Sequence, residues 1–157
     1  MRSPIFLFAI LAGSGLYLSA AIADDTKPQD AKVHFKQFDG TWKVVGLEAD
    51  GVKAPADALK GMRWSFNGTE VEFADPGEKP ANKTGLKIDW AKSPKQIDLV
   101  GQQGKLKGKT IQGIFKFEKD RLIICLRDPE AANKGRPKEF KTEAESGLGM
   151  ITLERMK

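Results

Sequence analysis

Residues 62 to 73 constrain the fold of this chain more than any other stretch. Apolar and polar side chains alternate through residues 62–66 and again through residues 69–73, and Asn67-Gly68 separates the two runs. Asn-Gly between alternating runs predicts a β-hairpin with a two-residue type I′ turn. Apolar pairs then share one face and an opposite-charge pair lies on the other. The predicted cross-strand pairs are Trp64 with Val71, Met62 with Phe73 and Arg63 with Glu72.

The rest of the chain repeats this pattern of short alternating runs separated by turn residues. Turns are predicted at Asp50-Gly51, at Ser93-Pro94-Lys95 and at Lys119-Asp120. Eight short strands in sequence predict an all-β fold, an eight-stranded antiparallel up-and-down barrel, because closure leaves no exposed sheet edge. A β-sandwich is the alternative, and the sequential hairpins favour the barrel. The further strands are predicted at residues 41–49, 86–90, 96–100, 110–118, 121–127 and 148–155.

The turn at Lys119-Asp120 fixes a second predicted register. It sets Glu118 opposite Arg121, and it places the apolar side chains of the two strands on one face. Because this turn has no glycine, a positive φ in it costs about 1 kcal/mol.

The N-terminal residues have the pattern of an export signal. Arg2 precedes an apolar run that begins at Ile5, and Ala21-Ile22-Ala23 matches a cleavage site. A membrane anchor is the alternative, but the run is shorter than the roughly 20 apolar residues of a spanning helix. We therefore expect a cleaved signal over residues 1–23, export to the periplasm or the cell exterior, and no membrane span after cleavage.

Residues 24–35 are expected to form a polar lead-in and the start of a short N-terminal helix, and residues 36–157 the barrel domain. Phe35 and Phe38 are spaced i,i+3, which predicts a helix that plugs one end of the fold. Gly40 ends that helix, and Gly40-Thr41-Trp42 opens the first strand.

Charge and cysteine content limit the classes of function. Loss of Arg2 with the signal leaves 25 basic against 21 acidic side chains, a net charge of +4, which is far below that of a nucleic-acid-binding domain. Cys125 is the only cysteine, and it lies in the apolar run 122–126. A free cysteine in such a run is usually a small core residue, and an intermolecular disulfide is the alternative.

Gly40-x-Trp42 before a series of barrel strands resembles the lipocalins. In that superfamily the tryptophan closes one end of the barrel and an arginine of the last strand packs across it. Arg155 is the matching residue, since it shares strand parity with Ile151 and Leu153 and is expected to point inward. Chance occurrence of this short motif is the alternative. Gly40, Trp42 and Arg155 are therefore the expected closure residues, with a cation–π contact of about 0.5 to 2 kcal/mol.

A more specific resemblance covers residues 36–156. The chain is similar to an uncharacterised lipocalin-like domain family known mainly from planctomycetes, which often has Gly-Asp where this chain has Lys119-Asp120. The resemblance implies a fold and no activity. It rests on Gly40-x-Trp42, Asp50-Gly51, Ile97-Asp98-Leu99, Gly113-Ile114-Phe115, residues 122–125, Arg136-Pro137-x-Glu139-Phe140 and Leu153-Glu154-Arg155.

Few residues suggest catalysis. His34 is the only histidine, so neither a Ser-His-Asp triad, a Cys-His pair nor a zinc cluster is spelled out. Asp89 and Asp98 alternate with apolar residues and are expected to face solvent. The glycines at 101, 104 and 108 do not stand between a strand and a helix, so they do not form a phosphate cradle. We expect no enzyme activity, no metal and no cofactor.

Bulky inward-facing residues suggest the remaining site. Eight strands enclose either a filled core or one small ligand. The aromatic residues expected to line a pocket for a small apolar or amphipathic ligand are Trp64, Phe66, Phe73, Trp90 and Phe115. The alternative is a solid barrel that contacts a cell-envelope protein or an anionic polymer, for which Lys105, Lys107 and Lys109 are candidate contacts unless they belong to a solvated loop.

Overall fold

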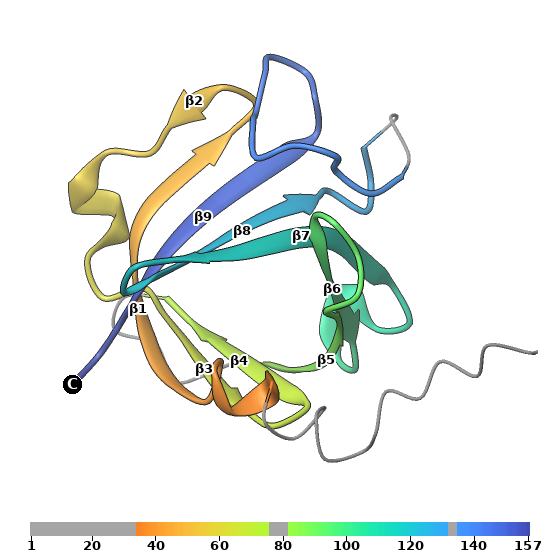
Figure 1. Cartoon of the computed structure of the whole chain (residues 1–157). Coiled ribbons are helices and arrows are strands. Elements are labelled where there is room, and N and C mark those ends of the chain that lie inside the picture. The colour runs from red at the N-terminus through yellow and green to blue at the C-terminus, as the bar shows by residue number, and fades with distance from the viewer. Residues whose placement is uncertain (1–33, 76–81, 132–134) are drawn as a thin grey trace, which may run out of the picture.

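A computed structural model describes residues 34–75, 82–131 and 135–157; the signal sequence and most of the lead-in lie outside these residues. The described part forms one antiparallel sheet of nine strands that closes into a barrel of eight, with β2 as an additional strand (Figure 1). The strands are β1 (Gly40–Ala49), β2 (Val52–Lys53), β3 (Arg63–Asn67), β4 (Glu70–Ala74), β5 (Asn82–Asp89), β6 (Lys95–Gly101), β7 (Thr110–Glu118), β8 (Arg121–Arg127) and β9 (Leu148–Arg155).

The expected up-and-down barrel is confirmed, and its strands follow one another around a ring (Figure 1). The ring closes where β1 pairs with β9 over seven residue pairs, interrupted by a bulge between Val44 and Gly46. Two short 3₁₀ helices, η1 (Ala56–Leu59) and η2 (Gly104–Leu106), lie in the connections. The bulky apolar residues with inward parity belong to the core or pack against it, as the alternation predicts.

The expected closure residues meet at one end of the barrel. Trp42 and Arg155 are directly paired across β1 and β9, and the guanidinium carbon lies 4.4 Å from the centroid of the indole. Arg155 also donates through Nη2 to the carbonyl of Gln37 at 2.6 Å and through Nη1 to that of Asp39. Gly40 has a φ of 114°, and a Cβ there would lie 3.0 Å from the arginine Nη1. The glycine is therefore required by the backbone and by this close approach.

The expected plug occupies the same end. Residues 34–36 form a helical turn, and the Phe38 side chain that follows is fully buried. The Trp42 Nε1 donates to the Phe38 carbonyl at 2.7 Å, so the first strand holds the segment that precedes it. The Asp39 carboxylate accepts from the amide of Gly68 at 2.8 Å and joins this segment to the β3–β4 turn.

The register expected for the β3–β4 hairpin is wrong, because the turn lies one residue later in the chain than predicted. Asn67 pairs with Glu70, so the turn residues are Gly68 and Thr69, and Trp64 lies opposite Phe73. Only Gly68 of the two has a positive φ, 57°, and a type I′ turn needs two such residues. The hydrogen bond from the Gly68 amide to the Asp39 carboxylate stabilises the turn at Gly68-Thr69. A shift by one residue on both strands keeps every side chain on its expected face.

Two other turns lie where the sequence predicts them. The β7–β8 turn has the expected register, with Glu118 opposite Arg121, and Lys119 adopts the positive φ of 53°. Asp50 and Gly51 both have positive φ and connect β1 to β2, a strand of two residues that the alternation did not predict.

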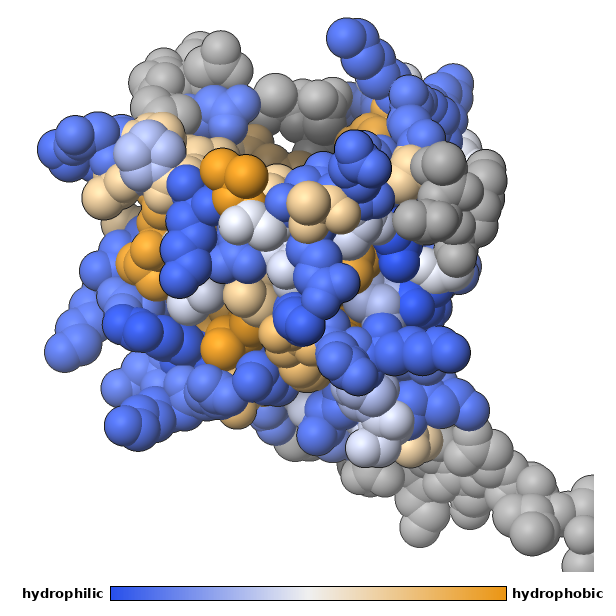
Figure 2. Space-filling view, turned by 90° about the horizontal axis from the view of Figure 1, so that it is seen from above, coloured by the Kyte–Doolittle hydropathy of each residue, from blue (hydrophilic) through white to orange (hydrophobic). Residues whose placement is uncertain are grey.

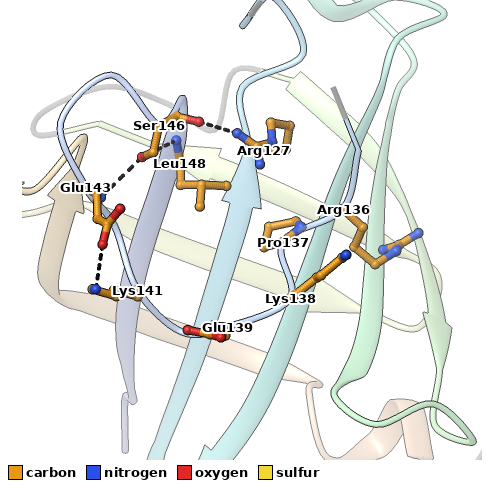
Figure 3. A pocket seen from close by; sticks show the side chains of 9 residues that line it. All are labelled: Arg127, Arg136, Pro137, Lys138, Glu139, Lys141, Glu143, Ser146 and Leu148. Atoms are coloured by element: carbon orange, nitrogen blue, oxygen red, sulfur yellow. Dashed lines mark hydrogen bonds and ion pairs between the residues drawn. The ribbon is translucent and has the colours of Figure 1, made fainter. Parts of the chain in front are cut away.

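The connection between β8 and β9 is rich in polar residues, and its residues 135–147 form a strap along the outside of the barrel (Figure 3). Pro137 and Thr142 of the strap are buried. Ile114 and Cys125 have outward parity, yet they are 1% and 0% exposed. The strap therefore provides a second, smaller apolar layer over β7 and β8.

Candidate functional site

The five aromatic residues expected to line a pocket lie at the core, on β3, β4, β7 and the end of β5. They form two pairs, with ring centroids 4.5 Å apart for Trp64 and Phe73 and 5.0 Å apart for Trp90 and Phe115. Phe66 packs against Trp64 at 6.1 Å. The structure thus brings these residues into two packed groups of edge-to-face and tilted rings, arrangements that aromatic pairs prefer.

Phe38 fills the space between these residues. Its ring centroid lies 5.5 Å from that of Phe66, 6.1 Å from Trp90 and 5.0 Å from Phe115. A ligand bound among the five aromatic rings at this end would have to displace a fully buried phenylalanine of the chain itself. Binding there would therefore cost the burial of that side chain, about 1.5 to 3 kcal/mol.

The most apolar of the hollows found lies on the outside of the barrel wall. β1 pairs with β3 from Gly40 to Lys43, and η1 lies beside β1 beyond this point. A hollow of about 430 Å³ lies beside η1, and its apolar lining includes Val45, Leu59 and Met62. This volume falls in the range of small-molecule sites.

A second hollow of about 360 Å³ also borders η1. It shares Val45, Ala56 and Leu59 with the first and extends to Leu47 and Met150. We call the two together the η1 groove. The groove follows the outer side of β1 from residue 43 to residue 48, a distance of roughly 16 Å at about 3.3 Å per residue.

The rim of the first hollow is basic. Of the described residues that line it, Lys43, Lys60 and Arg63 are cationic and none is acidic. The Lys43 Nζ lies 2.9 Å from a carboxylate oxygen of Glu154, and the Lys60 Nζ lies 2.7 Å from one of Asp57. Sequence reasoning missed this groove because its residues come from β1, η1, β3 and the C-terminus, and only the barrel bulge and the position of η1 beside β1 bring them together.

A third hollow of about 360 Å³ lies along the strap (Figure 3). Its arginines are held by the protein itself. Arg127 donates to the carbonyls of Gly135 and Ser146. Arg136 donates to the carbonyls of Ile97 and Gly113 and pairs with Asp98 at 2.7 Å. These contacts explain the Arg136-Pro137 motif as an anchor of the strap.

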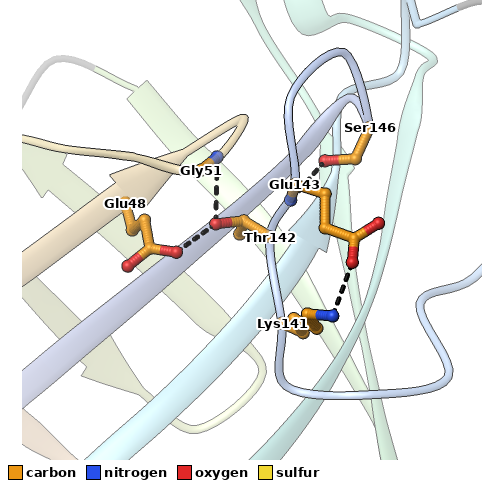
Figure 4. Close-up of polar contacts among 6 residues, drawn as sticks. All are labelled: Glu48, Gly51, Lys141, Thr142, Glu143 and Ser146. Carbon is orange, nitrogen blue, oxygen red and sulfur yellow. Dashed lines mark hydrogen bonds and ion pairs between the residues drawn. The ribbon is translucent and has the colours of Figure 1, made fainter.

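The strap is also fastened to the β1–β2 turn (Figure 4). Thr142 donates to the Glu48 carboxylate and accepts from the amide of Gly51 at 3.1 Å. Lys141 pairs with Glu143, which raises the pKa of the lysine and lowers that of the carboxyl group. Most of the polar residues around the strap hollow are therefore engaged in contacts that hold the strap in place.

The residues considered for catalysis each contact other parts of the protein. His34 stacks on Trp90 with ring centroids 4.5 Å apart. Cys125 is fully buried beneath the strap, and burial raises the pKa of its thiol. Asp98 has outward parity but pairs with Arg136, and Asp89 accepts from the Ala91 amide at 3.0 Å in a turn. These contacts account for each of the four side chains structurally.

The lysines after β6 do not form an extended row. Residues 104–106 form η2, and Lys109 pairs with Glu130, which lowers the pKa of that carboxyl group. Among the residues that the structure describes, no group of three or more His, Cys, Asp and Glu side chains is arranged to hold a metal ion. Within the same residues, no helix has the length and apolar character needed to cross a membrane.

Comparisons with known proteins add no relative. No protein-family model matches the chain, and searches of curated proteins and of solved structures found no similar protein. The resemblance to the planctomycete family thus stays a prediction.

Proposed function

We propose that this chain is a non-enzymatic binding protein that holds one single-chain amphipathic molecule in the η1 groove, with the barrel as its scaffold. The expectation from sequence was an apolar or amphipathic ligand inside the barrel. The packing of Phe38 against the predicted pocket residues favours a site on the outer wall instead.

The observation that carries the proposal is the composition of the groove. Its floor is apolar and includes two methionines, Met62 and Met156, and the latter is 50% exposed. Methionine side chains are flexible and polarizable, and they suit binding surfaces that adapt to an alkyl chain. Apolar surface in a groove of this size stabilises a bound tail by roughly 25 cal/mol for each Å² removed from water.

The experiment is a titration with decanol and decanoate, below the concentration at which either aggregates, followed by calorimetry and native mass spectrometry. We expect one bound molecule per chain. Val45→Asp places a charge in the groove and should abolish binding. Val52→Asp is the matched control, because Val52 is also a strand valine but is 71% exposed. If Val45→Asp fails to fold, Met62→Gln serves as the groove variant.

Two results would overturn this function. The first is the absence of binding by either compound. The second is binding that Val45→Asp and Met62→Gln leave unchanged while their circular dichroism matches that of the parent chain.

A second candidate is an interaction module with a solid barrel. The exposed Val52 and Met156 are the apolar side chains that such a module would offer to a partner. Native mass spectrometry of protein taken from its own host distinguishes the two candidates. A small co-purifying mass supports amphiphile binding, and a protein-sized partner that is lost in Val52→Asp supports the module.

We further propose export after cleavage at Ala21-Ile22-Ala23, which lies outside the described residues. N-terminal sequencing of material from the periplasm or medium is expected to begin at Asp24. An intact Met1 in a membrane fraction would contradict it.

A further inference from the structure

The outer face of the barrel carries a row of four charged residues across neighbouring strands. Arg121 on β8 lies opposite Glu154 on β9, and Glu154 lies opposite Lys43 on β1. Lys43 in turn lies opposite Arg63 on β3. The row therefore reads positive, negative, positive, positive.

The Glu154 carboxylate forms ion pairs with two of the three cations. Glu154 lies 2.9 Å from the Lys43 Nζ and 2.9 Å from the Arg121 Nη2. The hydrogen bonds from Lys43 and Arg121 lower the pKa of the Glu154 carboxyl group, so it is ionised at neutral pH. The row keeps a surplus of two positive charges even with Glu154 ionised.

The surplus lies at the groove, at the end of the row that Lys43 and Arg63 occupy. Both residues line the first hollow. Like charges directly opposite on paired strands destabilise a sheet. A sequence that breaks such a local rule without a compensating contact usually does so at a functional site. Within the described residues, the Arg63 guanidinium has no acidic partner within 4.0 Å; the ion pairs found involve other residues, those of Lys43 and Lys60 among them.

We infer that Lys43 and Arg63 form a head-group site, and that the η1 groove selects a single-chain amphiphile with a carboxylate or phosphate head. This inference rests on the proposed function and adds the chemical class of the ligand. A guanidinium binds a carboxylate or phosphate through two parallel hydrogen bonds, and the lysine opposite supplies a second charge. The tail then runs along β1 over Val45 and Leu59 toward Met150.

The charge distribution also assigns the orientation of the ligand. The cations Lys43, Lys60 and Arg63 belong to the first hollow, whereas the second hollow is lined by both Glu48 and Lys53. The Glu48 carboxylate accepts from Thr142, so it is already held by the strap. An anionic head is therefore favoured at the Arg63 end and an apolar tail at the Met150 end.

The test compares decanoate and decyl phosphate with decanol and decyltrimethylammonium, which share one tail. We expect the two anions to bind at least tenfold more tightly than decanol, a difference of about 1.4 kcal/mol, and the cation to bind more weakly still. Raising the salt concentration should weaken binding of the anions and leave decanol unaffected, because screening acts on the head-group contact alone.

Variants assign the effect to particular residues. Arg63→Gln should reduce decanoate binding about tenfold and leave decanol binding unchanged. Lys87→Gln is the control, since it removes the same charge from an exposed strand position outside the groove. Glu154→Gln should tighten decanoate binding, because it frees Lys43 from its carboxylate partner.

The outcomes separate this inference from the function it rests on. If decanol binds as tightly as decanoate, or if Arg63→Gln and Lys87→Gln behave alike, the head-group site is wrong while amphiphile binding stands. If none of the four compounds binds the parent chain, both fail. Preference for the anions that depends on Arg63 supports both.

Discussion

The contact between Trp42 and Arg155 allows a quantitative test of barrel closure. Trp42→Ala removes a buried indole and should lower the free energy of unfolding by about 3 to 5 kcal/mol. Arg155→Ala removes the cation–π contact and two bonds to backbone carbonyls. From typical values for such contacts we expect a loss of about 1 to 3 kcal/mol.

The two losses should not add. The cation–π contact is lost in either single variant, so the double variant loses it only once, and we expect a coupling of about 1 kcal/mol. Urea unfolding followed by far-ultraviolet circular dichroism measures all four proteins without relying on tryptophan fluorescence. Trp42→Ala combined with Lys105→Ala is the control cycle, and it should be additive. A Trp42–Arg155 coupling below about 0.3 kcal/mol would refute the closure argument.

Three further predictions follow from buried and paired groups. Phe38→Ala should cost about 3 to 5 kcal/mol in urea unfolding because it leaves a cavity among the core rings; a cost below about 1 kcal/mol would show that Phe38 does not fill the barrel end. Arg136→Ala should free the strap and speed labelling of the Cys125 thiol by a thiol reagent under native conditions, and an unchanged rate would contradict the anchor. The lowered pKa of Glu154 means that its pairing stabilises the fold above about pH 4.5 and that this contribution disappears as pH falls below that value. Between pH 7 and pH 3 the midpoint temperature of thermal unfolding should therefore fall less steeply for Glu154→Gln than for the parent chain. Parallel curves of midpoint against pH would contradict this prediction.

Local sequence patterns were sufficient for much of the fold. Alternation placed β7, β8 and β9 with the observed bounds, since turns at known residues separate short strands with one apolar face. The resemblance to the lipocalins suggested the contact of Arg155 with Trp42, and strand parity indicated that Arg155 points inward. The β3–β4 register was missed because the contact between the Asp39 carboxylate and the Gly68 amide decides between two turn positions. Asp39 lies outside the hairpin, 29 residues before Gly68 in the sequence.

The site was less predictable than the fold. The five aromatic residues were correctly placed inward, and the segment with Phe38 was expected to plug one end of the barrel. Neither pattern shows that the Phe38 ring fills the space between these aromatic residues. The η1 groove depends on the Val44–Gly46 bulge and on the short β1–β3 ladder, neither of which has a local sequence signal. The strap was not predicted, because its anchors, Arg136 and Thr142, bond to residues of distant strands.

The location of a bound amphiphile tests the central claim most directly. Two-dimensional NMR spectra of the chain, recorded while decanoate is added, report on the groove and on the core in one experiment. We predict shifts of the Val45, Leu59 and Met62 signals that saturate at one molecule per chain, with the indole signal of Trp90 unchanged. Saturable shifts of Trp90 and Phe115 with an unchanged groove would place the ligand inside the barrel and contradict the account.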